Sequence, residues 1–213
     1  MAHSAVAHHI VAVCRNLYER GFVSATDGNV SSRLPNGNIL TTPTSVNKGR
    51  IKESDLVEVT LDGVPVRSTQ VPSMELGMHL FIYSERPDVR AVVHAHPIYA
   101  TGFATARIPM DQPIFPEVLF ALGAIPLAEF ATPSTPEVAA SIAPFVKTAS
   151  AILLANHGVV AYGKDLDDAY FKMEKVEHAA QTLVVARMLG GEKTLTTEQV
   201  RKLKAVFNQQ RAE

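Results

Sequence analysis

The segment Arg90-Ala-Val-Val-His-Ala-His-Pro97 constrains the fold more than any other part of this chain. Val92 and Val93 indicate a buried strand, and Pro97 ends it because proline cannot donate to a strand ladder. Residues two apart in a strand point to the same face, which aims His94 and His96 at one point beside the strand end. We interpret the pair as two metal ligands, although a His-x-His pair also occurs without a metal.

Length and charge set the broad class of the protein. The chain has 213 residues with no linker or repeat, so we expect a single domain over residues 1–213. It has 20 basic and 21 acidic residues without a basic cluster, which argues against nucleic acid or an anionic membrane as a partner. No export signal or transmembrane run stands out, and the one cysteine, Cys14, excludes an internal disulfide. We expect a buried structural thiol and a cytoplasmic protein.

Hydrophobic periodicity predicts hairpins mixed with helices. The expected helices cover residues 4–19, 73–83, 100–106, 136–146, 165–189 and 197–208. The expected strands cover residues 29–34, 38–42, 57–61, 64–66, 91–96, 124–127, 151–154 and 159–162. Helices before, between and after the hairpins imply an α/β fold in which a sheet is covered on both faces.

A third imidazole would complete a catalytic metal site. Structural zinc sites usually have four ligands that include cysteines, whereas catalytic sites have about three protein ligands. His157 is the best third ligand, because it follows the strand 151–154 and Gly158 permits a tight turn after it. Neutral imidazoles favour zinc over magnesium or calcium. Three unrelated histidines remain the alternative to this prediction.

Glu75 has two interpretations. Ser73 is a suitable N-cap, which places Glu75 in the first turn of a helix, where the dipole favours a carboxylate. If the same carboxylate lies beside the metal, it can ligate or remove a proton. His79 follows one turn later on the same helical face, and we expect it to pack behind the site.

Three short segments are candidates for anion binding. The loops Thr26-Asp-Gly28-Asn29 and Thr42-Pro-Thr-Ser45 are rich in hydroxyls and backbone amides, and Ser73 caps a helix whose amides suit a phosphate. Loops of this composition are also ordinary turns. Lys48 and Arg50 either add positive charge there or lie in a solvated loop.

Five ordered motifs resemble the class II aldolase/adducin family, and within it the ketose-1-phosphate aldolases that act on substrates such as fuculose 1-phosphate. They are Thr26-x-Gly-Asn29, Thr42-Pro-Thr44, Pro72-Ser-x-Glu75, Val93-His-x-His96 and Asn156-His-Gly158. The resemblance runs from about Ala7 to Ala186, and the ordered combination is far more specific than any single motif.

The resemblance implies a three-layer α/β/α sandwich with a central, mainly antiparallel sheet, usually in a homotetramer with active sites between subunits. It implies that His94, His96 and His157 bind one Zn²⁺ per chain, with Glu75 as the metal-adjacent acid/base. The residues that it assigns to the substrate phosphate are Thr26, Gly28, Asn29, Thr44, Ser45 and Ser73. The implied reaction cleaves a ketose 1-phosphate, fuculose-like or a 5-deoxy or 5-methylthio ribulose 1-phosphate, to dihydroxyacetone phosphate and an aldehyde.

Some positions depart from the family pattern. The fuculose enzymes have a second serine where this chain has Met74, a glycine where it has Ser45, and a tyrosine near residues 114–117, where none stands here. Glu117 is a possible substitute acid, although a surface glutamate explains it as well. Apolar Phe115, Val118 and Met74 would suit a deoxy or methylthio aldehyde.

The same family leaves alternative functions open. A sugar-acid phosphate decarboxylase is the first, because a metal-held carbonyl stabilises the enolate left by loss of carbon dioxide as well as the one left by aldol cleavage. A pentulose-phosphate 4-epimerase and a methylthioribulose-phosphate dehydratase could use the same metal. The alternative of another class is a non-catalytic, adducin-like interaction module, which is expected to lack the metal ligands.

Overall fold

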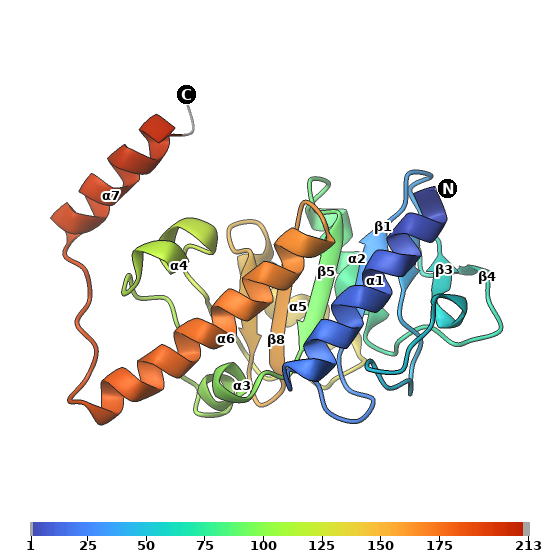
Figure 1. The fold of residues 1–213 in the computed structure, drawn as a ribbon, viewed down its shortest axis with the longest axis horizontal. Coiled ribbons are helices and arrows are strands. Elements are labelled where there is room, and N and C mark those ends of the chain that lie inside the picture. The colour runs from blue at the N-terminus through green and yellow to red at the C-terminus, as the bar shows by residue number, and fades with distance from the viewer. Residues whose placement is uncertain (1, 211–213) are drawn as a thin grey trace.

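The computed structural model describes residues 2–210 and is built on an eight-stranded sheet (Figure 1). The strand order is β4-β3-β2-β1-β5-β8-β7-β6. The strands are β1 Asn29–Arg33, β2 Ile39–Thr41, β3 Val57–Val59, β4 Pro65–Arg67, β5 Ala91–Ala95, β6 Leu127–Ala128, β7 Ala151–Leu154 and β8 Gly158–Gly163. Every neighbouring pair is antiparallel except β6 and β7, which confirms the mainly antiparallel sheet.

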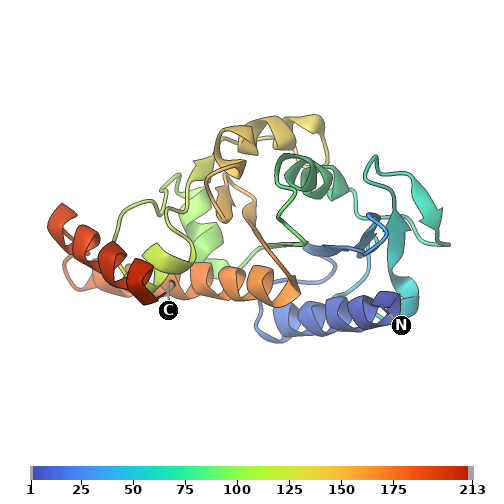
Figure 2. The same ribbon diagram turned by 90° about the horizontal axis from the view of Figure 1, so that it is seen from above.

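Helices cover both faces of the sheet, so the predicted three layers are confirmed. The helices are α1 Ala2–Glu19, α2 Leu76–Glu85, α3 Ile98–Thr105, α4 Pro116–Ala121, α5 Pro136–Val146, α6 Leu166–Met188 and α7 Thr197–Gln210, with a 3₁₀ turn, η1, at Glu53–Asp55. Seen from above, α1 and α6 lie along one side of the sheet, and α2 and α5 lie along the other (Figure 2). No described helix is long and apolar enough to cross a membrane.

The central strand β5 shows how the sheet directs its side chains. Val93 and Ala95 pack into the core that contains α1 and α6, whereas Val92 packs into the core that contains α2 and α5. Because strand residues alternate between faces, His94 points to the α2 side. Cys14 on α1 is buried as expected, and burial raises the pKa of its thiol to about 12.

The structure differs from the sequence prediction mainly at element ends. The helix expected from Ser73 begins at Leu76, because the Ser73 amide donates to the Thr42 carbonyl at 3.2 Å and holds this segment extended. The strand expected to reach His96 ends at Ala95, and the strand expected over 124–127 instead comprises Leu127–Ala128, which share only Leu127 with it. The short helix α4 was not predicted.

Candidate active site and metal centre

Three histidine rings converge where β5 ends and β8 begins. The rings of His94, His96 and His157 lie 4.8 to 5.0 Å apart, and one nitrogen from each lies within 4.8 Å of the others. Nδ1 of His94 donates to the Val159 carbonyl at 2.9 Å, an assignment that leaves Nε2 as the free nitrogen of this buried ring. That nitrogen lies 3.1 Å from Nε2 of His96, so both lone pairs face the same space.

This arrangement fits a bound cation. Two unprotonated imidazole nitrogens in contact repel each other unless a proton or a metal lies between them. Zinc–nitrogen bonds of about 2.0–2.1 Å place tetrahedral ligands about 3.3 Å apart, close to the observed separation of His94 and His96. Burial lowers the pKa of His96 to about 3, and the neighbouring His94 and His157 act in the same direction. His96 is therefore held in the neutral form that a metal requires.

His157 occupies the turn between β7 and β8, as predicted, but for a different local reason. Its amide donates to the Leu154 carbonyl at 3.0 Å, and Asn156 takes the left-handed conformation, with φ of 56°. Gly158 is not in that conformation. A side chain there would lie 2.5 Å from Cδ2 of His96 and 2.6 Å from the Ala95 carbonyl, so Gly158 allows β5 and its histidine to approach.

Glu75 lies against the histidines rather than in the first helical turn. Its carboxylate is 3.3 Å from Nε2 of His94 and 3.1 Å from Nε2 of His157, and it accepts a bond of 2.9 Å from Nδ2 of Asn29. Burial favours a higher pKa for Glu75, but without a metal a proton on Nε2 of His94 supplies a positive charge, and this charge and the hydrogen bonds from His157 and His94 bring the pKa well below its usual range. The carboxylate is therefore ionised, and the expected helix-dipole role does not explain its position.

A polar ladder between β1 and α2 fixes Glu75 in this position. Alternate residues of β1 contact residues spaced four apart at and after the start of α2. Asn29 contacts Glu75, and Ser31 contacts His79 at 2.7 Å and Tyr83 at 2.9 Å. Arg33 donates to the Tyr83 carbonyl at 2.9 Å. His79 packs behind the site, as expected. Ser31 and Tyr83 were not predicted from the sequence, although the four-residue spacing from Glu75 through His79 to Tyr83 was a usable signal.

A cavity of about 250 Å³, which we call the Glu75 cavity, opens beside the histidines. It contains every residue predicted for the substrate phosphate: Thr26, Gly28, Asn29, Thr44, Ser45 and Ser73. His96, His157, Glu75 and Lys48 also line it. Gly28 has φ of 71°, and a side chain there would lie 2.8 Å from the His94 carbonyl, so this loop can approach His94 only with glycine. The binding role of these residues stays a prediction.

Other predicted positions behave differently. Glu117 is exposed on α4 and does not line the Glu75 cavity. Phe115 and Val118 pack against the core on the α1 side, whereas Met74 is 69% exposed at the cavity mouth. Lys48 is buried rather than solvated, because its ammonium is enclosed by two loops.

Fold, histidine cluster and cavity together define a protein of the class II aldolase type, and sequence comparison agrees. Residues 8–184 match the model of the Class II Aldolase and Adducin N-terminal domain. The chain belongs to this family.

Its relatives include enzymes of two reaction types. A 3-oxo-tetronate 4-phosphate decarboxylase from Escherichia coli is 33% identical over 178 residues, which cover 81% of this chain and 83% of the relative. An L-fuculose phosphate aldolase from Methanocaldococcus jannaschii is 34% identical over 171 residues, which cover 80% and 91% of the two chains.

Solved structures show the same division. The Escherichia coli protein YgbL, for which aldolase, epimerase and decarboxylase are named as alternatives, matches with a TM-score of 0.88 at 28% identity, covering 95% of this chain and 99% of that one. An L-fuculose 1-phosphate aldolase matches with a TM-score of 0.87 at 32% identity, covering 98% and 100% of the two chains.

Proposed function

We propose that this protein is a metal-dependent lyase that cleaves a ketose 1-phosphate to dihydroxyacetone phosphate and an aldehyde. The observation that carries the proposal is the position of Glu75, an ionised carboxylate between His94 and His157 in a cavity lined by hydroxyl and amide donors. Relatives named as acting on phosphorylated sugars support the substrate class.

His94, His96 and His157 would hold one divalent ion, and their borderline nitrogen ligands favour Zn²⁺. When bound, the ion would supply Lewis-acid polarisation of the substrate carbonyl. The hydrogen bond from Nδ1 of His94 to the Val159 carbonyl orients that ring toward the site.

Glu75 would move the proton at the carbon next to the carbonyl. In the addition direction it removes that proton from dihydroxyacetone phosphate, and in the cleavage direction it returns it. Asn29 holds the carboxylate by its amide, which keeps the basic oxygen at the wall of the cavity. The aldehyde half would extend into an adjoining cavity of about 320 Å³, where Met74, Met78 and Val138 suit an apolar tail.

A screen of ketose 1-phosphates, with an assay coupled to dihydroxyacetone phosphate, tests this function. Zinc-loaded protein should release dihydroxyacetone phosphate and an equimolar aldehyde from at least one fuculose-like, 5-deoxy or 5-methylthio ketose 1-phosphate. Release from none of them would overturn the aldolase proposal.

Decarboxylation of a phosphorylated sugar acid is the second candidate. Glu75 is the carboxylate nearest the histidines in the described chain, at 3.1 and 3.3 Å against 3.9 Å for Asp27, and decarboxylation needs only one proton delivered to the carbon that loses carbon dioxide. The decarboxylase relatives support this reaction at an identity similar to that of the aldolases. Release of carbon dioxide and equimolar dihydroxyacetone phosphate from 3-oxo-tetronate 4-phosphate, with no aldehyde released from any ketose 1-phosphate, would favour it over the aldolase.

We also propose a homotetramer with sites between subunits, which would let a neighbouring chain bring a second acid such as Glu117 to the cavity. Sedimentation at micromolar concentration should give a tetramer, and a monomer would contradict it. An adducin-like module without catalysis would bind no stoichiometric metal, so elemental analysis separates it from either enzyme.

A further inference from the structure

Lys48 is a buried lysine in the wall of the Glu75 cavity. Only 1% of its surface is exposed, and its Nζ donates to the Thr26 carbonyl at 3.0 Å and the Val46 carbonyl at 2.8 Å. An ammonium has three N–H donors, so these two bonds leave one donor over. Within residues 2–210, no other hydrogen bond and no ion pair to this ammonium is formed.

The charge of Lys48 has no counterpart of its own. It is the one lysine or arginine among the described residues that line the cavity, and the predicted phosphate donors around it are neutral. Asp27 and Glu75 line the same cavity, but neither is within ion-pair distance of the ammonium. A buried charge without a paired ion is costly, and burial lowers the pKa of Lys48, partly offset by its acidic neighbours.

The ammonium also lies where the predicted anion-binding loops meet. Thr26 belongs to the loop that continues through Gly28 to Asn29, and Val46 directly follows Ser45. The third segment is attached to the second, since the Ser73 amide donates to the Thr42 carbonyl. A ligand held by the hydroxyls and amides of these loops would therefore lie next to the unused N–H of Lys48.

We propose that Lys48 donates this third N–H to the phosphate of the substrate and is the charged group that selects phosphorylated over unphosphorylated ligands. The inference rests on the proposed function, because it needs a phosphorylated substrate in the Glu75 cavity. The phosphate dianion supplies the counter-charge that the buried ammonium lacks. Hydrogen bonds between charged groups are roughly twice as strong as neutral ones, so one lysine can dominate recognition by several hydroxyls. The competing role for Lys48 is a purely structural tie between the two loops.

Calorimetric titration of the full-length, zinc-loaded protein tests the proposal with three probes: dihydroxyacetone phosphate, dihydroxyacetone and inorganic phosphate. Lys48→Met removes the charge and keeps most of the side-chain volume, and Lys48→Gln removes the charge but keeps an N–H donor for a loop carbonyl. Lys48→Arg keeps the charge. Lys52→Met, at an exposed lysine on the same segment, is the matched control.

The expected result is weaker binding of dihydroxyacetone phosphate by roughly 10- to 100-fold in Lys48→Met and Lys48→Gln. In the same two variants, the affinity for dihydroxyacetone should change less than about twofold, and the affinity for inorganic phosphate should be lost. Lys48→Arg should recover part of the affinity for phosphate. The control should bind like the wild type. If Lys48→Met does not fold, as judged by its thermal transition, Lys48→Gln is held to the same expectation.

Two results would overturn the inference about Lys48 and leave the proposed function standing. Unchanged binding of dihydroxyacetone phosphate in the charge-removed variants would show that the neutral donors suffice. An equal loss for dihydroxyacetone phosphate and dihydroxyacetone would show that Lys48 only holds the loops together. If the wild type binds neither dihydroxyacetone phosphate nor phosphate, the proposed phosphorylated substrate fails as well, and the inference fails with it.

Discussion

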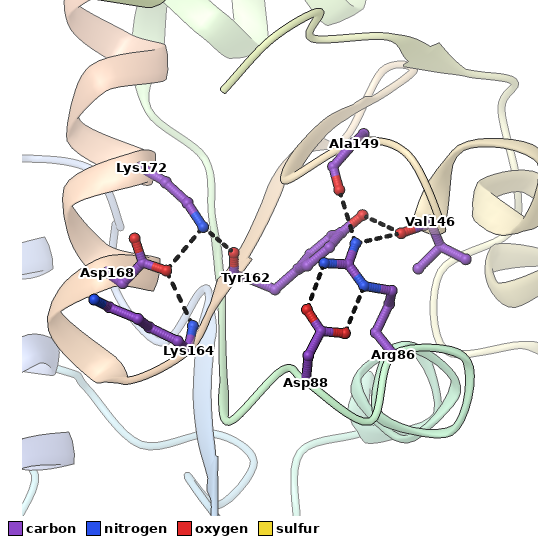
Figure 3. Close-up of polar contacts among 8 residues, drawn as sticks. All are labelled: Arg86, Asp88, Val146, Ala149, Tyr162, Lys164, Asp168 and Lys172. Atoms are coloured by element: carbon purple, nitrogen blue, oxygen red, sulfur yellow. Dashed lines mark hydrogen bonds and ion pairs between the residues drawn. The ribbon is translucent and has the colours of Figure 1, made fainter. Parts of the chain in front are cut away.

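Two polar clusters lie at opposite ends of the β5–β8 pair, and they differ in how their charges are balanced. At the end farther from the histidines, Nε and Nη2 of Arg86 donate to the two carboxylate oxygens of Asp88 at 2.8 and 2.7 Å (Figure 3). Nη1 of Arg86 donates to the Val146 and Ala149 carbonyls. Tyr162 donates to the Val146 carbonyl at 3.0 Å. Each strong donor in this cluster has an acceptor.

The other half of this cluster, around Lys172 and Asp168, pairs its charges in the same way. Lys172 lies 2.8 Å from Asp168 and 3.1 Å from the Tyr162 carbonyl, and the Lys164 amide donates to Asp168 at 3.0 Å (Figure 3). These bonds join the end of β8 to the start of α6. The charged groups of this cluster pair with one another, which is the pattern of a structural network.

The histidine end lacks this balance. His94 and His96 bring two nitrogen lone pairs together, Lys48 is buried without the carboxylate partner that Lys172 has, and Nε2 of buried His79 and Oδ1 of buried Asn29 have no hydrogen-bond partner. Polar groups that are buried and incompletely paired cost stability unless a ligand completes them. One end of the β5–β8 pair therefore has the pattern of a structural network, and the other has the pattern expected of a ligand site.

Of the substitutions that test this contrast, removal of one histidine should have the largest effect, which is on metal content. A small effect would contradict the contrast between the two ends. His96→Ala leaves two protein ligands, too few for a stable site, so the purified protein should lose its stoichiometric metal. Lys172→Met, at the opposite end, should keep one ion per chain. Elemental analysis of both variants and the wild type checks this, and metal retained by His96→Ala would mean that the histidines are not the ligands.

The same experiment has a pH dependence with a defined sign. Burial opposes the charged form of His94, but Glu75 and the Val159 carbonyl raise its pKa above the ordinary value. Protons therefore compete with the metal for His94 at a higher pH than for a free histidine, and affinity should fall on acidification from about pH 7. Metal affinity measured between pH 8 and 5 should decrease monotonically, and a flat profile would contradict histidine ligation.

Glu75→Gln should have the next largest effect, on turnover rather than on the metal. The amide keeps the size of the side chain but cannot accept a proton, so the rate should fall by roughly a hundredfold to ten-thousandfold. Metal content should change little compared with His96→Ala. Glu129→Gln, at a side chain that is 91% exposed, serves as the control and should retain its rate. Near-normal turnover of Glu75→Gln with every cleaved substrate would mean that another group carries the proton.

The sequence predicted best what depends on local alternation. The shared face of His94 and His96 follows from the period of a strand, and the structure brings the two rings together. The five ordered motifs predicted the family and therefore the layers of the fold, which are confirmed. Most helices and strands follow their apolar spacing to within a few residues.

The sequence failed where contacts between distant segments decide the structure. The start of α2 depends on a bond from Ser73 to Thr42, and the burial of Lys48 depends on Thr26, so neither is visible in a local window. Gly158 was correctly singled out, but its reason is the approach of His96 from another strand. The short α4 has only six residues, too few for a helical period to be recognised.

Arg86→Met should affect stability and leave the site intact, which sharpens the contrast between the two ends. It removes the fork to Asp88 and leaves the Ala149 carbonyl without its side-chain donor. Because Asp88 is largely exposed, solvent screens the ion pair, and we expect a loss of about 1–3 kcal/mol in the free energy of unfolding. Denaturant unfolding measures this, with Arg201→Met on the exposed face of α7 as the control. A normal metal content with lowered stability is expected, and loss of metal in the folded protein would show that the ends are coupled.

The smallest expected effect concerns His79, which sits behind the site with one unpartnered nitrogen. Burial lowers the pKa of His79 to about 3, with a further contribution from His94. Between about pH 6.5 and pH 3 the unfolded chain therefore binds a proton that the folded protein refuses, so this residue's contribution to stability falls as pH decreases through that window. In metal-free protein, His79→Gln should flatten the dependence of the unfolding free energy on pH by on the order of 1 kcal/mol per pH unit. His178→Gln, at a position on α6 that is exposed to solvent in the folded protein, serves as the control and should leave the slope unchanged. Equal slopes for the wild type and His79→Gln would mean that His79 can be protonated in the folded protein. The contrast in polar pairing between the two ends would then be smaller than the geometry indicates.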